Sequence, residues 1–325
     1  MIAFSVSARL LGDIGGTNAR FAWQSDPSAP VTLVESYSCA DFESLDAAIH
    51  QYLVSHDLPS PRHCAIGIAT PIVGDLIRMT NSAWCFSQSA LKEHFGFERL
   101  VVINDFTALA LALPELNRTE LHVIGCGEAE PGFAKALIGA GTGLGVSGLL
   151  PDGNGSWVPI AGEGGHVSLV GQTEEEFAVI TELRRRFGHV SAERALSGPG
   201  LVNLYEVSAR LALRTSKPLT PEQILNSSDS DLDCLRAVHL FAAFLGSVAG
   251  DLALTLGARG GVFIGGGIAP RLLAALERSE FRARFEGKGR FQSYLAAIPT
   301  SVIVSRQSPA LIGAAKALDR HLISN

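Results

Sequence analysis

Short apolar runs that end in glycine or in polar residues alternate along the chain with longer segments of helical spacing. Continuous apolar runs of this kind, bounded by turn-forming residues, predict buried strands. The runs are CAIGIA at 64–69, LVVI at 100–103 and GVFI at 261–264. Strands of this type between helical segments are typical of an α/β protein.

The longer segments predict helices. The stretch 174–187 is amphipathic and ends at Gly188, whereas 232–256 is rich in Ala and Leu and predicts a long buried helix. Two more helices are expected at 106–113 and 308–322. No linker-like or low-complexity segment interrupts the pattern, so we expect closely packed lobes joined by hinges.

Three glycine clusters punctuate this pattern, and the first two resemble each other. They are LLGDIGGTNARFAW at 10–23, LIGAGTGLGVSGLL at 137–150 and GGVFIGGGIAP at 260–270. In the first two, an apolar run leads into glycines, then Thr17 or Thr142, then another apolar run. This order predicts a hairpin whose glycine-rich turn lets backbone N–H groups approach a ligand. Its repetition about 127 positions later predicts a duplicated half.

Composition and charge narrow the class of protein. Hydrophobic residues make up 47% of the chain and charged residues 18%, which indicates a folded chain. Lys and Arg number 26 against 32 Asp and Glu, a net charge of −6, and no stretch is strongly basic. We therefore expect no nucleic acid and no membrane surface as partner. A small anion held by backbone dipoles is compatible with this charge.

We expect neither a membrane span nor an export signal. The longest uncharged apolar window, 237–250, stops at Asp251, whereas a span needs about 20 residues. The N-terminal residues lack a basic region and a long apolar stretch. Five scattered cysteines without a Cys-x-x-Cys predict neither a disulfide framework nor structural zinc. These features favour a reduced, cytoplasmic protein.

Asp13 is the first candidate for chemistry, because it lies in the Gly12–Thr17 segment where we expect the turn of the first hairpin. Backbone donors and the hydroxyl of Thr17 suit a phosphate, and a carboxylate beside a phosphate requires a cation between them. Asp13 is therefore a natural partner for Mg²⁺. An ordinary glycine-rich hairpin is the alternative, and the second copy of the motif favours the functional interpretation.

Asn104 and Asp105 directly follow the strand predicted at 100–103. Ligands of open α/β sheets bind at the carboxyl ends of the strands, where a carboxylate can accept a proton from a hydroxyl nucleophile. The alternative is an N-cap for the next helix. Both can hold, with one residue capping while the other reaches a ligand.

Glu163 and His166 lie in a glycine-flanked loop, GEGGH at 162–166, that can present both side chains to a polyhydroxy ligand. A metal site is disfavoured because no further His or Cys lies at ligand spacing. A structural, hydrogen-bonded histidine is the remaining alternative. The sequence also lacks a P-loop, a clean G-x-G-x-x-G that opens a helix and a G-x-S-x-G elbow.

Taken together, these segments resemble the bacterial glucokinase family of the actin/hexokinase/Hsp70-like superfamily. The resemblance runs nearly end to end and is most specific in the long segment at 188–205. The matching segments are GDIGGTNAR (12–20), MTNSAWCFS (79–87), INDFTALA (103–110), GAGTGLGV (139–146), GEGGHV (162–167), GHVSAERALSGPGLVNLY (188–205), GGVFIGGGIAPR (260–271) and FRARFEGKGRF (281–291).

The resemblance implies a two-lobed actin-like ATPase (ribonuclease H-like) fold with a duplicated α/β core, and a homodimer. Residues 1–114 plus 306–325 would form a small α/β lobe and 115–305 a large one, with ATP and sugar in the cleft between them. Arg9 departs from the family's continuous apolar first strand. We expect its side chain near a sheet edge or reaching solvent.

The implied activity is ATP- and Mg²⁺-dependent phosphorylation of D-glucose at the 6-hydroxyl. In this resemblance Asp105 is the catalytic base and Asp13 meets Mg²⁺ through water. The sugar-binding residues it implies are Asn104, Asp105, Glu163, His166 and Glu193. The ATP-binding residues it implies are Gly12, Asp13, Ile14, Gly15, Gly16, Thr17, Gly141, Thr142, Gly143, Gly265 and Gly266.

Two alternatives stay open beside glucose phosphorylation. A kinase for another hexose or an amino sugar would carry the same motifs. A sugar-sensing regulator would need a DNA-binding domain ahead of the first hairpin. The eleven residues before Gly12 leave no room for such a domain, which disfavours the regulator.

Overall fold

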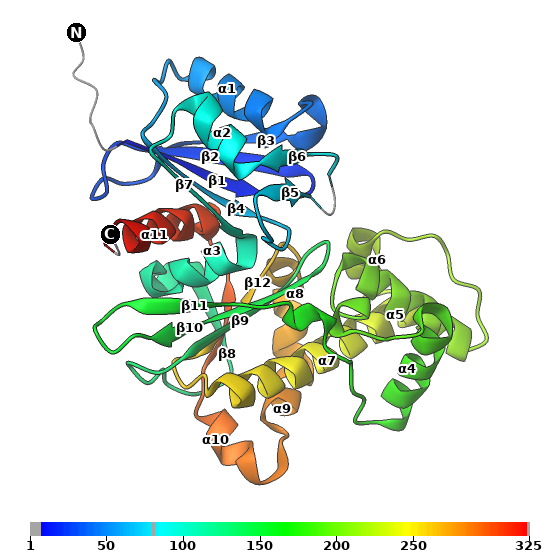
Figure 1. Cartoon of the computed structure of the whole chain (residues 1–325). Helices are drawn as coiled ribbons and strands as arrows, with labels where there is room; N and C mark the ends of the chain where they lie inside the picture. Colours follow the sequence, from blue (N-terminus) through cyan, green and yellow to red (C-terminus); the bar gives the residue numbers. More distant parts are fainter. Residues whose placement is uncertain (1–7, 80–81, 324–325) are drawn as a thin grey trace. The chain divides into compact units, whose positions relative to one another are not determined.

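The computed structural model describes residues 8–79 and 82–323. The motif at 79–87 therefore lies partly outside the described residues, because positions 80 and 81 are not among them. The chain forms two compact units (Figure 1). Each unit is built on its own β-sheet.

The first unit comprises the chain up to Leu116 and the segment from Ser305 onward. Its strands lie in the order β3-β2-β1-β4-β7, with α1 and α2 on one face and α3 and α11 on the other (Figure 1). The sheet strands are β1 (Arg9–Ile14), β2 (Asn18–Gln24), β3 (Thr32–Ser38), β4 (His63–Ile68) and β7 (Arg99–Asn104). The other elements are the pair β5 (Leu76–Arg78) and β6 (Cys85–Ser87), and the helices α1 (Leu45–Ser55), α2 (Gln88–Phe95), α3 (Asp105–Ala112) and α11 (Pro309–Ile323).

The second unit spans Asn117–Val304 and has a six-stranded sheet in the order β11-β10-β9-β12-β13-β8. Its strands are β8 (Leu121–Ile124), β9 (Lys135–Ala140), β10 (Leu144–Pro151), β11 (Trp157–Ala161), β12 (Val262–Gly265) and β13 (Thr300–Ile303). Its helices are α4 (Glu174–Phe187), α5 (Gly198–Leu211), α6 (Pro221–Ser227), α7 (Leu232–Leu256), α8 (Ala269–Arg278), α9 (Phe281–Glu286) and α10 (Gln292–Ala296). Two short 3₁₀ turns, η4 (Gly164–His166) and η5 (Ala192–Arg194), carry candidate site residues.

The two sheets repeat one topology. β1 pairs antiparallel with β2 and parallel with β4, and β9 pairs in the same way with β10 and β12. The order β3-β2-β1-β4-β7 thus corresponds strand by strand to β11-β10-β9-β12-β13, and β8 is an addition. The predicted duplication of an α/β core is confirmed.

The predicted elements are found close to their expected bounds. The helices α4 and α7 begin and end at the predicted residues, and α3 and α11 are shifted by one residue at each end. Local signals explain this agreement, because Thr173 caps α4 with its side chain and Gly257 ends α7 in the left-handed conformation.

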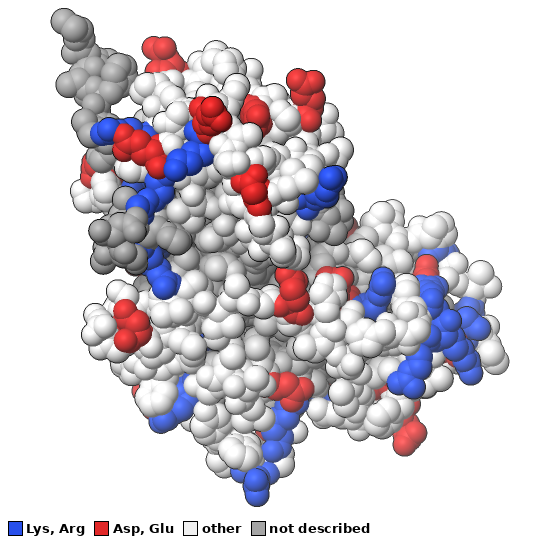
Figure 2. Space-filling model, viewed as in Figure 1, with Lys and Arg blue, Asp and Glu red and all other residues white. Residues whose placement is uncertain are grey.

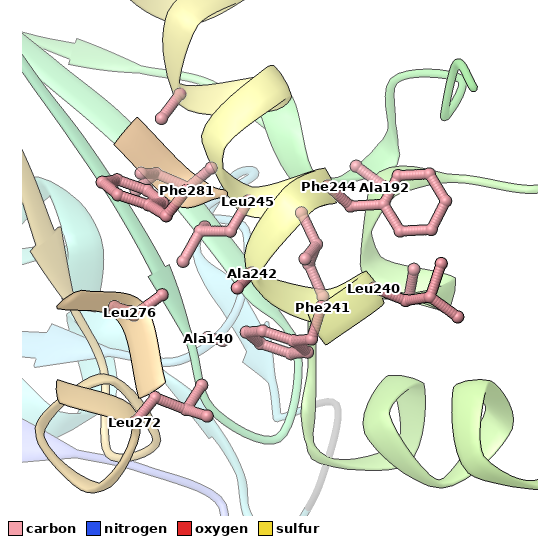
Figure 3. Packing of buried hydrophobic residues seen from close by; sticks show 14 of the residues in the cluster. Ala140, Ala192, Leu240, Phe241, Ala242, Phe244, Leu245, Leu272, Leu276 and Phe281 are labelled. Atoms are coloured by element: carbon pink, nitrogen blue, oxygen red, sulfur yellow. The ribbon is translucent and has the colours of Figure 1, made fainter. Parts of the chain in front are cut away.

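The helix α7 is the centre of the second unit's core. Among the described residues it is the one helix long and apolar enough to cross a membrane, and it extends beyond the 237–250 window. However, 72% of its most apolar window is buried inside the protein, as in the core helix of a folded domain. Figure 3 shows Phe241 of α7 beside Ala140, which ends β9, and both belong to the same hydrophobic cluster as Leu272 of α8. The helix therefore supports the strand that leads into the second glycine-rich turn.

Arg9 does not lie at an edge, and its side chain does not reach solvent. It starts β1, the middle strand of the first sheet, and it is only 1% exposed. Its guanidinium forms a 2.7 Å ion pair with Asp319 of α11 and a 3.2 Å hydrogen bond with Gln24. The expectation of an exposed Arg9 was wrong because its partner, Asp319, comes from the other end of the chain.

Charged side chains of both signs are spread over the face drawn in Figure 2. Basic side chains gather on it over α4 and α5, whose last turns carry three consecutive arginines at 184–186 and Arg210. Arg185 and Arg210 both pair with Glu182. Ion pairs of this kind reduce the net positive charge of the group.

Candidate active site

The first glycine-rich turn consists of Gly15, Gly16 and Thr17 between β1 and β2. Asp13, which we expected within the turn, is instead the fifth residue of β1, in register with Arg20 on β2. The strand continues through Asp13 because both neighbouring strands pair with it. Its carboxylate is thereby fixed on the sheet rather than on a mobile loop.

The carboxylate of Asp13 is held by two donors on one oxygen. Arg20 donates to Oδ2 over 3.2 Å, and the hydroxyl of Ser308 donates to the same atom over 2.6 Å. Within the described part of the chain, Oδ1 has no hydrogen-bond or ion-pair partner. Asp13 is 8% exposed, so this arrangement leaves one oriented oxygen for a cation or its water. A single carboxylate oxygen fits Mg²⁺ that would take most of its other ligands from phosphates and water.

Cys39 donates two hydrogen bonds to the carbonyls of the same turn. Its backbone N–H donates to the carbonyl of Thr17 over 2.8 Å, and its thiol donates to the carbonyl of Gly15 over 3.5 Å. Burial raises the pKa of the Cys39 thiol, so the sulfur stays protonated and can donate. Sequence reasoning missed this residue, because an isolated cysteine carries no spacing signal.

Asn104 and Asp105 lie where β7 passes into α3. Asn104 is the N-cap, and its Oδ1 accepts from the amides of Phe106 and Thr107 over 2.9 and 3.2 Å. Its Nδ2 is then the group left to donate to a ligand. Asp105 is half-buried, and its Oδ1 also accepts from the amide of Phe106 over 2.9 Å.

The strand register places this junction beside the first turn. Ile14 at the end of β1 is in register with Ile68 of β4, which is in register with Asn104. All three residues lie at carboxyl ends of parallel strands, and two strand spacings amount to about 10 Å. The helix α3 crosses α11 so closely that a Cβ at Gly313 would lie 1.6 Å from the carbonyl oxygen of Ala108. This close crossing fixes the start of α3.

In the second unit, the segments that carry Glu163, His166 and Glu193 run side by side. The amide of Leu169 donates to the carbonyl of Val190 over 2.9 Å. A second backbone hydrogen bond joins the same two segments at a point closer to the candidate residues. Glu163 and His166 are exposed at the two ends of η4, and Glu193 is half-buried in η5. The structure therefore brings these three candidates onto adjacent segments of one unit.

The second glycine-rich turn consists of Gly141, Thr142 and Gly143 between β9 and β10, closed by a 2.8 Å hydrogen bond from the amide of Gly141 to the carbonyl of Gly143. The carboxylate of Glu193 reaches this turn, where its Oε2 accepts from the amide of Leu144 over 2.9 Å. Sequence reasoning placed both segments at the site but had no signal for this contact.

The third glycine cluster lies beside the end of β9, where the second glycine-rich turn begins. Gly265, the last residue of β12, is in register with Gly139 of β9. Gly266 follows with a φ of 83°, and a Cβ there would lie 2.3 Å from the carbonyl oxygen of Ala140. The second unit thus brings the candidate sugar segments, the second glycine-rich turn and the candidate nucleoside segment together around the end of β9.

A duplicated sheet with a glycine-rich hairpin at the start of each copy is the arrangement of the actin-like ATPase fold, to which sugar kinases belong. The crystal structure of a glucokinase from an Antarctic psychrotroph is 38% identical, with a TM-score of 0.86 over 97% of this chain and 99% of that one. A ROK family glucokinase from Streptomyces griseus, solved with glucose and AMPPNP, is 18% identical with a TM-score of 0.65 over 96% and 99% of the two chains, which shows likeness of fold.

The chain belongs to the glucokinase family, whose model matches residues 10–321. A curated relative named glucokinase, from Aromatoleum aromaticum, is 52% identical over 97% of this chain and 95% of its own. The family resemblance expected from the motifs is confirmed.

Proposed function

We propose that this chain transfers the γ-phosphoryl group of ATP to the 6-hydroxyl of D-glucose, giving glucose 6-phosphate and ADP. Membership of the glucokinase family supports this proposal. The geometric observation that carries it is the hydrogen bond between Glu193 and Leu144, the residue that directly follows the turn at 141–143. A carboxylate suited to sugar hydroxyls there adjoins a glycine-rich turn suited to phosphates.

In this proposal, residues of the first unit contact the reacting 6-hydroxyl, and residues of the second unit bind the other sugar hydroxyls. The 6-hydroxyl of glucose donates a hydrogen bond to Asp105, which accepts the proton as the oxygen attacks the γ-phosphorus. Asn104 donates from Nδ2, and the remaining sugar hydroxyls are bound by Glu163, His166 and Glu193. Oriented groups of this kind lower the barrier mainly by positioning.

The phosphates of ATP are bound by backbone donors of the first hairpin, Gly12–Thr17, and by the turn at 141–143. Gly265 and Gly266 lie near the nucleoside. Asp13 would hold Mg²⁺ through water, and the ion would neutralise part of the phosphate charge when bound. We also propose that the protein is a cytoplasmic homodimer that binds neither nucleic acid nor membrane.

A hexose panel tests the proposal directly. The purified protein is incubated with ATP, Mg²⁺ and glucose, mannose, fructose or an amino sugar, and ADP release is followed by a coupled assay. We expect the highest kcat/KM with glucose and glucose 6-phosphate as the product identified by NMR. A higher kcat/KM with another hexose or an amino sugar would establish the alternative kinase. Failure to phosphorylate any sugar would refute both.

A further inference from the structure

The two carboxylate oxygens of Glu193 have different surroundings. Oε2 accepts from the amide of Leu144 over 2.9 Å, at the first residue of β10. Oε1 has no hydrogen-bond or ion-pair partner among the described residues. One oxygen thus binds the residue that directly follows the turn at 141–143, and the other is available to a ligand.

The glycines of this turn differ in how they meet Glu193. A Cβ at Gly143 would lie 2.5 Å from Oε2 of Glu193, closer than van der Waals contact permits. A Cβ at Gly141, two positions earlier in the same turn, would meet nothing within 4 Å. Neither glycine has a φ in the left-handed region. The requirement at Gly143 is therefore for space against the carboxylate, and not for an unusual backbone conformation.

Further contacts tie the sugar segments to the same hairpin. The amide of Gly198, five residues beyond Glu193, donates to the carbonyl of Gly141 over 2.8 Å. On the other segment, a Cβ at Gly165 would lie 2.1 Å from the carbonyl oxygen of Leu144. Packing this close transmits a displacement instead of absorbing it.

We propose that Glu193 is a positioning residue that couples the binding of the two substrates. The inference rests on the proposed function and names how its sugar and phosphate sites communicate. A sugar hydroxyl on Oε1 orders the carboxylate, and Oε2 then holds the Leu144 amide and the turn at 141–143 in the conformation that receives phosphate. Because coupling free energies are reciprocal, each substrate raises the affinity for the other by one factor.

Calorimetry on the full chain measures this factor without turnover. Glucose is titrated with and without a non-hydrolysable ATP analogue and Mg²⁺, and the ratio of the two dissociation constants is the coupling factor. We expect at least about fivefold for the wild type, the lower end of typical allosteric coupling. A ratio of one in a wild type that phosphorylates glucose would overturn the coupling and leave the proposed function intact.

Gly143→Ala and Gly141→Ala form the matched pair. We expect Gly143→Ala to weaken glucose binding in the absence of nucleotide by at least about fivefold and to bring the coupling factor close to one. Gly141→Ala should bind glucose alone with the wild-type affinity, because its Cβ enters open space. Equal glucose affinity in the two variants would refute the role of the Glu193 contact.

Glu193→Asp keeps the proposal testable if Gly143→Ala does not fold. It retains the charge but shortens the reach by one methylene, so Oε2 no longer meets the Leu144 amide. We expect weaker binding of the ATP analogue to the glucose-bound form, although this residue is assigned to the sugar. Unchanged analogue affinity would contradict the proposal, and a wild type that binds no glucose would refute the proposed function itself.

Discussion

The hydroxyl of Ser308 donates a 2.6 Å hydrogen bond to Oδ2 of Asp13, across 295 positions of sequence. Asp13 stands near the end of the first strand, and Ser308 immediately precedes the last helix. Arg20 is the second donor to the same oxygen. The geometry of the first glycine-rich hairpin therefore depends on the segment by which the chain returns to the first unit.

Ser308→Ala tests this dependence. Loss of a hydrogen bond to a charged group costs about 1.5–3 kcal/mol, so we expect the KM for ATP to rise by roughly tenfold. The KM for glucose should change little. Ser308→Thr keeps a hydroxyl and serves as the control, with kinetics close to those of the wild type. If Ser308→Ala and Ser308→Thr bind ATP equally well, the hydroxyl does not position Asp13.

The ion pair between Arg9 and Asp319 predicts a strong effect on stability. Arg9 is 1% exposed, and Asp319→Ala would leave its buried charge without its ion-pair partner, with only the hydrogen bond to Gln24 remaining. We expect the free energy of unfolding to fall by about 3 kcal/mol. This is the lower end of the range for broken buried ion pairs, because Asp319 is 33% exposed. The double variant Arg9→Met/Asp319→Leu should recover most of this loss in urea unfolding. A double variant less stable than Asp319→Ala would contradict the claim that the unpaired charge of Arg9 causes the loss.

His63 predicts how stability depends on pH. Burial lowers the pKa of its imidazole, against an opposing effect of Glu98, and the guanidinium of Arg9 lowers it further. Above the unfolded-state value of 6.5, the side chain is neutral in both states and contributes nothing. As the pH falls below that value, the unfolded chain binds a proton that the folded chain does not, so stability decreases.

The matched comparison is His63→Gln. Urea unfolding at about pH 7.5 and 5.5 should show a smaller loss of stability on acidification for the variant than for the wild type. The difference between the two proteins isolates His63 from other titrating groups. Equal losses would mean that the folded state binds the proton as readily as the unfolded chain.

Sugar preference tests the roles of Glu163 and His166. A missing or inverted hydroxyl leaves a polar group unpaired at a cost of about 1–3 kcal/mol, so glucose should exceed mannose and fructose in kcat/KM. We expect Glu163→Gln and His166→Ala each to reduce the ratio of kcat/KM for glucose to that for mannose or fructose by about tenfold. Both side chains are exposed, so melting temperatures should change little. Variants that lose stability and keep the wild-type preference would show that these residues only shape the loop.

Local signals account for the elements that the sequence predicted well. The helix α4 starts at its Thr173 cap and ends at Gly188, and both residues are visible in the sequence. The similarity of the two glycine clusters likewise predicted two hairpins, and the structure contains both. Chemistry-bearing residues could be named because they stand in motifs with a family resemblance.

Pairing between distant segments accounts for what the sequence did not predict. Arg9 was expected near solvent because nothing beside it in the chain indicates Asp319. Asp13 was expected in a turn because its neighbours are glycines, but register with Arg20 keeps it in the strand. The contact of Glu193 with Leu144 also depends on how two segments pack, which no local pattern encodes.

The turnover of Asp105→Asn tests the central claim most directly. An asparagine oxygen can still accept from the amide of Phe106, so the start of α3 should be kept while the base is lost. We predict that kcat falls by about two orders of magnitude or more, whereas the dissociation constant of glucose changes by less than about threefold. A variant that phosphorylates glucose at nearly the wild-type kcat would contradict the account.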